Sequence, residues 1–125
     1  MKKGRTILTG LVWPFLFLQT ALAQIPIEKE PHHKVVFENQ VVRVIDLVVA
    51  PHDTTLLHTH NAASVVIFLS TSSFAIQNPK QAPVVTQVKH GDIVYRDYDK
   101  KPVAHIVWSA DTSVFRCLVV EIKQK

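Results

Sequence analysis

An all-β domain of antiparallel strands is the fold class that the sequence predicts. Short runs of β-branched and aromatic residues follow one another, and each ends in turn-forming residues such as Pro, Asn, Asp, Gly and Ser. No segment sustains a helical period over ten or more residues, so helical crossovers between parallel strands are not expected. Regular short strands without such crossovers favour a single-domain antiparallel sandwich or barrel.

The first predicted strands are recognised by their apolar runs. Residues 34–38 (KVVFE) and 41–49 (VVRVIDLVV) are rich in valine, and PHD closes the second run. Residues 54–60 (TTLLHTH) and 64–70 (SVVIFLS) follow, separated by HNAA. The polar, proline-containing residues 24–34 are expected to form a loose lead-in or an edge strand ahead of a barrel domain at 35–125.

The later strands follow the same rule. They are predicted at residues 73–77 (SFAIQ), 83–90 (PVVTQVKH), 92–97 (DIVYRD), 102–109 (PVAHIVWS) and 114–122 (VFRCLVVEI). The segments NPKQAP, HGD, YDKK and ADT supply the tight connections between them. No repeat, low-complexity tract or linker divides this part of the chain, which indicates one core.

Residues 1–23 have the three-part pattern of a secretory signal peptide. A basic start precedes an apolar stretch at residues 7–18, and the small-residue motif Ala21-Leu22-Ala23 follows. The stretch is shorter than the roughly 20 residues of a spanning helix, and Pro14 interrupts it, so no stable membrane anchor is expected. The sequence thus predicts cleavage after Ala23 and a periplasmic or secreted protein.

The charge of the expected mature chain is nearly balanced. Of 14 Lys and Arg residues, three lie in residues 1–23, which leaves 11 against 10 Asp and Glu. This balance gives no reason to expect a nucleic-acid partner. The single cysteine, Cys117, lies in an apolar run and is expected to be a buried, inert thiol.

Three histidines within apolar strands are the candidate metal ligands. His58 and His60 alternate along one predicted strand, so both side chains face the same side of the sheet. His105 lies within a later apolar strand, which a barrel can bring close to the earlier pair. Buried imidazoles without carboxylates nearby need a metal or a hydrogen-bond network to satisfy their nitrogens. The alternative to metal binding is that these histidines lie at the rim or in the core without a metal.

With these motifs the chain resembles the cupins, specifically the small single-domain, RmlC-like members, over about residues 35–122. The resemblance implies a jelly-roll barrel, often a homodimer, that binds a divalent metal through histidines of two motifs. His58 and His60 match the first motif, and Gly91 and His105 match the second. The resemblance thus implies a metal site at His58, His60 and His105.

The chain departs from the cupin motifs at several positions. The glycine that usually opens the first motif is His52, and the usual glutamate ligand is Ser64. Gln77, Tyr95 and Tyr98 are candidates for a fourth contact. His32 and His33 lie in the lead-in, where no companion ligand is evident. Three-histidine cupins exist, so the loss of the glutamate does not exclude a metal.

Several functions remain open at this stage. The first is an exported protein that holds a divalent metal and a small ligand in the barrel, with zinc or copper favoured by affinity. The second is a metal-dependent enzyme, dioxygenase- or isomerase-like, which would need iron or manganese; no general base is identified. The third is a degenerate, metal-free cupin with a structural or binding role. The sequence does not specify a substrate or a reaction.

Overall fold

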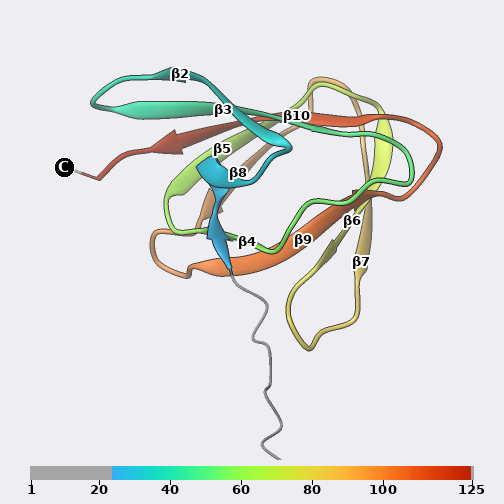
Figure 1. Ribbon diagram of the computed structural model, residues 1–125. Coiled ribbons are helices and arrows are strands. Elements are labelled where there is room, and N and C mark those ends of the chain that lie inside the picture. Colours follow the sequence, from blue (N-terminus) through green and yellow to red (C-terminus); the bar gives the residue numbers. More distant parts are fainter. Residues whose placement is uncertain (1–23, 125) are drawn as a thin grey trace, which may run out of the picture.

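The computed structural model describes residues 24–124, so the predicted signal peptide at 1–23 lies outside the described residues. The described chain is all-β and forms two five-stranded sheets (Figure 1). One sheet has the order β1-β4-β9-β6-β7, and the other has the order β2-β3-β10-β5-β8. The strands are β1 (Ile25–Pro26), β2 (His33–Glu38), β3 (Val42–Val49), β4 (His58–His60), β5 (Ala63–Phe68), β6 (Ser72–Gln77), β7 (Val84–Val88), β8 (Ile93–Asp97), β9 (Val103–Ser109) and β10 (Phe115–Ile122), and a 3-10 turn, η1, spans Ile27–Lys29.

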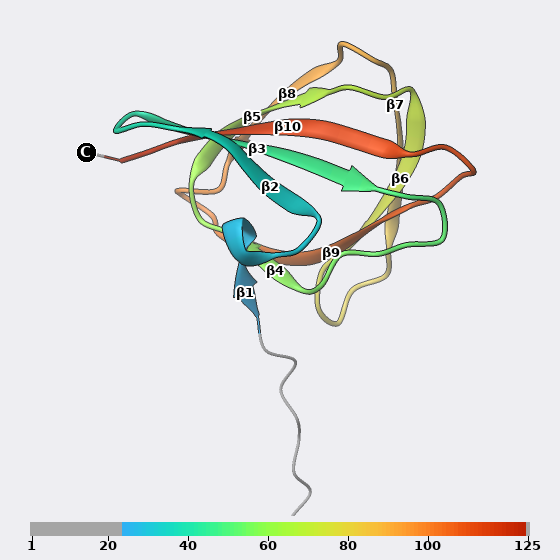
Figure 2. The ribbon, with the colours of Figure 1, turned by 45° about the horizontal axis from the view of Figure 1, so that its top comes forward.

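The two sheets face one another as a jelly-roll sandwich, and Figure 2 shows the strands curving around a common interior. The strand pairs are antiparallel except for β1 and β4, which run parallel. Strands distant in the chain are neighbours: β10 lies between β3 and β5, and β9 lies between β4 and β6. The predicted all-β, single-domain jelly roll is therefore confirmed. Within residues 24–124, no helix is long and apolar enough to cross a membrane.

The core lies between the sheets because each strand alternates buried and outward side chains. On β10, Phe115, Cys117 and Val119 are buried, and the residues between them point outward. The Phe115 ring stacks on Phe74, with ring centroids 4.3 Å apart, and Phe68 packs against both. These phenylalanines fill the interior between the sheets and leave the histidines of β4 and β9 at another part of the same interior.

Three described residues, His52, Lys80 and Gly91, have positive φ angles, a conformation that glycine adopts without strain. Gly91, in the turn between β7 and β8, has φ 92°, and its N–H donates to the Phe68 carbonyl at 2.8 Å. His52, which stands at the glycine position of the first cupin motif, has φ 65°. The turn before β4 therefore has a residue in the left-handed conformation although no glycine stands there.

The strand predicted at residues 54–60 is too long, because the structure has a strand only at His58–His60. In the segment before His58, hydrogen bonds from backbone N–H groups to side chains replace the regular bonds between strands. The Val107 N–H donates to Thr55 Oγ1 at 2.9 Å, and the Leu56 N–H donates to Glu30 Oε1 at 3.0 Å. These side-chain partners hold the segment in place without regular strand pairing.

Candidate metal centre

The β4–β9 ladder brings the three predicted histidines together. His58 lies directly opposite His105 in the antiparallel register, and His60 projects to the same side as His58. The three ring centroids are 4.7–5.0 Å apart. One ring nitrogen from each residue lies within 4.8 Å of the other two. Within residues 24–124 this group contains no carboxylate or cysteine, so it offers nitrogen ligands alone.

Two nitrogen atoms in this cluster lack hydrogen-bond partners among the described residues. His58 is fully buried, and its Nδ1–H donates to the Leu56 carbonyl at 2.9 Å, which leaves Nε2 as the acceptor. Within residues 24–124 neither His58 Nε2 nor His60 Nδ1 has a partner. His60 Nε2 and His105 Nε2 face each other at 3.1 Å, a separation that two nitrogens at about 2.0–2.1 Å from one ion can have. The donor set therefore fits a divalent metal ion.

Burial keeps the three imidazoles neutral. It lowers the pKa of His58 to about 4. Burial and the neighbouring imidazoles lower the pKa of His60 to about 2 and that of His105 to about 3. A neutral imidazole has a free lone pair, which is the form that binds metal. At neutral pH all three residues are therefore in the ligating form.

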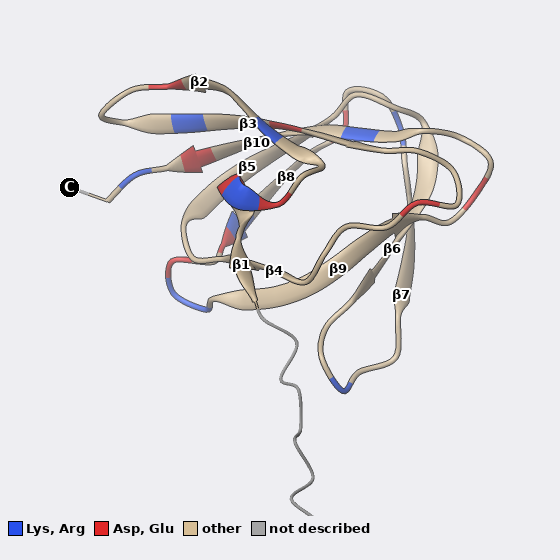
Figure 3. Ribbon diagram, in the orientation of Figure 1, with Lys and Arg blue, Asp and Glu red and all other residues tan. Residues whose placement is uncertain are grey.

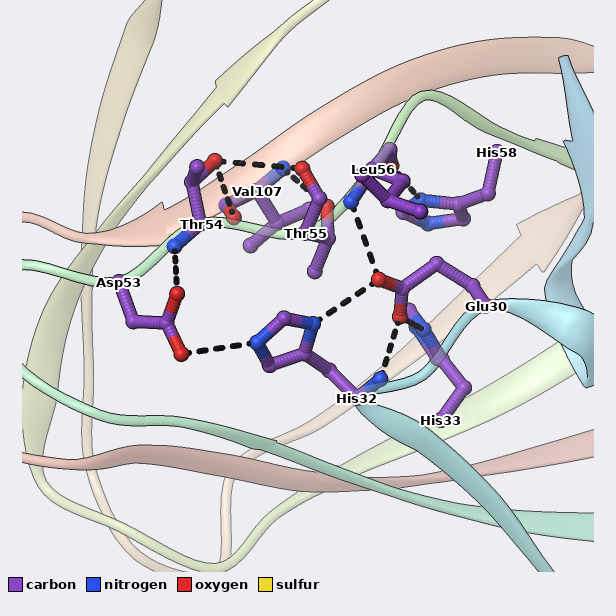
Figure 4. A network of polar contacts seen from close by, with 9 residues as sticks. All are labelled: Glu30, His32, His33, Asp53, Thr54, Thr55, Leu56, His58 and Val107. Atoms are coloured by element: carbon purple, nitrogen blue, oxygen red, sulfur yellow. Dashed lines mark hydrogen bonds and ion pairs between the residues drawn. The ribbon is translucent and has the colours of Figure 1, made fainter. Parts of the chain in front are cut away.

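Glu30 and His33 lie beside the histidine cluster, a position that the sequence did not predict. His33, expected in a lead-in without a companion ligand, is only 4% exposed, and its ring centroid lies 4.5 Å from that of His58. Its Nδ1–H donates to Glu30 Oε2 at 2.6 Å (Figure 4). The parallel pairing of β1 with β4 brings residues 24–34 against the histidines, with β1 as a short edge strand. The only sequence signal was the proximity of Glu30 to His32 and His33.

Glu30 is a buried carboxylate that four donors surround. It accepts hydrogen bonds from His33 Nδ1, from the His32 backbone N–H and Nδ1, and from the Leu56 N–H, at 2.6–3.0 Å. Burial by itself would raise the pKa of Glu30, but these hydrogen bonds outweigh it and lower the pKa to about 2. His32 also contacts Asp53 through Nε2 at 2.9 Å, so the network links residues 24–34 to the turn before β4 (Figure 4).

A cavity of about 60 Å³ adjoins the three histidines. Its wall is largely apolar, with polar contributions from Ser64, Arg96 and Tyr98. Ser64, which stands at the position of the usual glutamate, is 1% exposed and its Oγ has no partner among the described residues. Of the three candidates for a fourth contact, Tyr98 lies with its ring 5.2 Å from His60. Tyr95 is 58% exposed, and the Gln77 amide donates to the Gln81 carbonyl.

Solved structures with the same fold are known. A cupin domain from Bordetella pertussis Tohama I is 22% identical, with a TM-score of 0.66 over 83% of this chain and all of its own. An RmlC-like cupin family protein from Methanocaldococcus jannaschii is 15% identical, with a TM-score of 0.56 over 91% and 93% of the two chains.

A protein with a double-stranded β-helix domain from Klebsiella pneumoniae is 20% identical, with a TM-score of 0.56 over 78% of this chain and 75% of its own. No family model and no curated protein matches the sequence. These likenesses show that residues 24–124 have the cupin fold.

Proposed function

We propose that this cupin-fold protein binds one divalent metal ion through His58, His60 and His105 and holds a small molecule in the adjoining cavity. The observation that carries the proposal is the convergence of three buried imidazoles whose nitrogens lie within 4.8 Å of one another. Buried polar atoms without partners are rare in folded proteins, and a metal ion would supply the partner that His58 Nε2 lacks among the described residues. Three protein ligands also leave coordination positions for a small ligand.

A neutral, three-nitrogen site sets the expected order of metal affinity. It follows the Irving–Williams series, so copper and zinc bind more tightly than iron or manganese. When bound, such an ion acts as a Lewis acid toward a ligand beside it. The protein itself contributes the apolar cavity wall and the three fixed nitrogen donors. These residues therefore favour a binding protein that contains zinc or copper over an enzyme that contains iron or manganese.

Metal content of wild type and variants tests this proposal. We expect the purified chain without residues 1–23 to bind about one zinc ion per molecule. Because His60→Ala and His105→Ala each leave two ligands, both should lose most of the metal. His90→Ala is the matched control, since His90 is exposed in the turn before Gly91. Wild-type metal content in both cluster variants would show that the histidines are structural, as in a metal-free cupin.

Turnover would distinguish an enzyme from a binding protein. We assign no general base among the described residues. The proposed role is therefore limited to binding the metal and a small molecule. Iron-dependent oxygen consumption in the presence of a small chelating molecule, lost in His105→Ala, would instead support the enzyme. A zinc-filled protein without such turnover would support the binding role.

We propose in addition that the protein is exported and that cleavage follows Ala23. The basis is the basic start, short apolar stretch and Ala21-Leu22-Ala23 motif of residues 1–23. Intact-mass measurement on protein from the cell envelope or medium should give a chain that begins at Gln24. A membrane-held chain that retains Met1 would contradict this.

A further inference from the structure

Arg96 is a positively charged side chain in the cavity wall without an acidic partner. It lies on β8 opposite Ser64 of β5, and both residues line the cavity. Arg43 and Arg116 contact carboxylates at 3.0 Å and 2.8 Å, and Figure 3 shows basic and acidic residues adjacent across β2, β3 and β10. Arg96 has no carboxylate within ion-pair distance among residues 24–124, although it is half-buried.

Two residues with hydroxyl groups, Ser64 and Tyr98, line the same cavity as Arg96. Ser64 Oγ is buried and has no partner in the described part of the chain. Tyr98 is half-buried in the same wall and lies against His60. Arg96, Ser64 and Tyr98 line the same cavity as His58, His60 and His105. The three polar side chains and the candidate metal centre thus face one space.

The residues around the cavity favour an anion once a metal is present. None of the described lining residues is Asp or Glu, and imidazole binds metal in its neutral form. Even with the buried Glu30 carboxylate behind His33, a divalent ion and Arg96 would leave net positive charge in a largely apolar cavity, which is costly. A carboxylate matches the planar fork of arginine, accepts hydrogen bonds from hydroxyl groups and is a good metal ligand.

The cavity also limits the size of this anion. One water-sized group needs about 10–15 Å³ of such volume, so the cavity of about 60 Å³ suits a ligand of a few such groups. We infer that the protein binds a small carboxylic acid of this size, held by Arg96, Ser64 and Tyr98 beside the metal. This inference rests on the proposed metal function and specifies the ligand class of the same site.

Calorimetry with a matched pair of probes tests the inference. Glycolate carries a carboxylate, and glycolamide has nearly the same shape without charge. The zinc-loaded wild type should bind glycolate at least about tenfold more tightly than glycolamide, because hydrogen bonds between charged groups contribute about 1.5–3 kcal/mol. Equal affinity for the two probes would overturn the inference in the wild-type protein itself.

Arginine variants identify the residue responsible. Arg96→Gln should weaken glycolate binding at least about tenfold while zinc content stays at the wild-type level. Arg96→Lys keeps the charge and should retain part of the affinity. Arg116→Gln is the control, because Arg116 pairs with Asp46 on the outer face. Unchanged glycolate affinity in zinc-loaded Arg96→Gln would refute the role of Arg96, whereas absence of zinc from the wild type would refute the metal proposal.

Discussion

Replacing Glu30 with glutamine removes the negative charge at the centre of the network beside the histidines. The carboxylate accepts hydrogen bonds from two imidazoles and two backbone N–H groups, and it is only 1% exposed. The glutamine amide has one acceptor oxygen, and its NH₂ group would face another donor. We therefore expect Glu30→Gln to lower the free energy of unfolding, through weaker hydrogen bonds and a buried donor without a partner.

The pKa of Glu30 sets the size of this effect. It falls from 4.5 to about 2 on folding, and each pKa unit corresponds to about 1.4 kcal/mol. Ionised Glu30 thus contributes about 3 kcal/mol to stability. Because the folded pKa is the lower one, the contribution is complete above pH 4.5 and is lost as the pH falls toward 2.

Urea unfolding of the metal-free protein at pH 7, followed by circular dichroism, tests the calculation. The wild type should exceed Glu30→Gln by about 3 kcal/mol at this pH. Glu28→Gln is the matched control, since Glu28 contacts Arg43 at 3.5 Å and is partly exposed; it should change stability by less than about 1 kcal/mol. Free energies of unfolding at pH 7 that agree within about 0.5 kcal/mol between wild type and Glu30→Gln would refute the reasoning.

Three further predictions concern other parts of the molecule. His52→Gly should raise the free energy of unfolding by up to about 1 kcal/mol, because glycine adopts the positive φ of this turn without strain; a less stable variant in urea unfolding would contradict it. Burial raises the pKa of the Cys117 thiol to about 12, so iodoacetamide at pH 8 should label it at least about 100-fold more slowly in native than in unfolded protein; equal rates would show an accessible thiol. The pKa values of His58, His60 and His105 are lowered in the folded protein. As the pH falls, the unfolded chain therefore binds protons at these residues at a higher pH than the folded chain does. The metal-free protein should thus lose roughly 2 kcal/mol per imidazole between pH 7 and pH 5, and a flat stability profile would exclude this.

Strand positions were largely predictable because β-branched runs alternate between the core and the surface. The run predicted at 41–49 is β3 at Val42–Val49, and that at 114–122 is β10 at Phe115–Ile122. The period of two also placed His58 and His60 on one side of their strand. To predict that His105 lies near this pair, the order of the strands in the sheet must be known. The cupin resemblance supplied that order, whereas the periodicity of a single strand does not contain it.

The network at Glu30 was not predictable from periodicity. It depends on β1, a strand of two residues, pairing in parallel with β4. So short a strand has no alternating pattern, and residues 24–34 contain prolines and charges that are typical of loops. Whether Glu30 is solvated or buried is decided by contacts with Leu56, which lies far from it in the sequence.

The β4–β9 register determines when during folding a metal ion can be captured. His58 and His105 belong to segments far apart in the chain, and the hairpin β6–β7 and strands β5 and β8 form between them. Folds dominated by such distant pairings take milliseconds to seconds to form. The complete ligand set thus exists only once β4 and β9 have paired, whereas the ligands of a zinc finger lie close together in the chain. In refolding experiments, the appearance of metal affinity would report the pairing of these two strands.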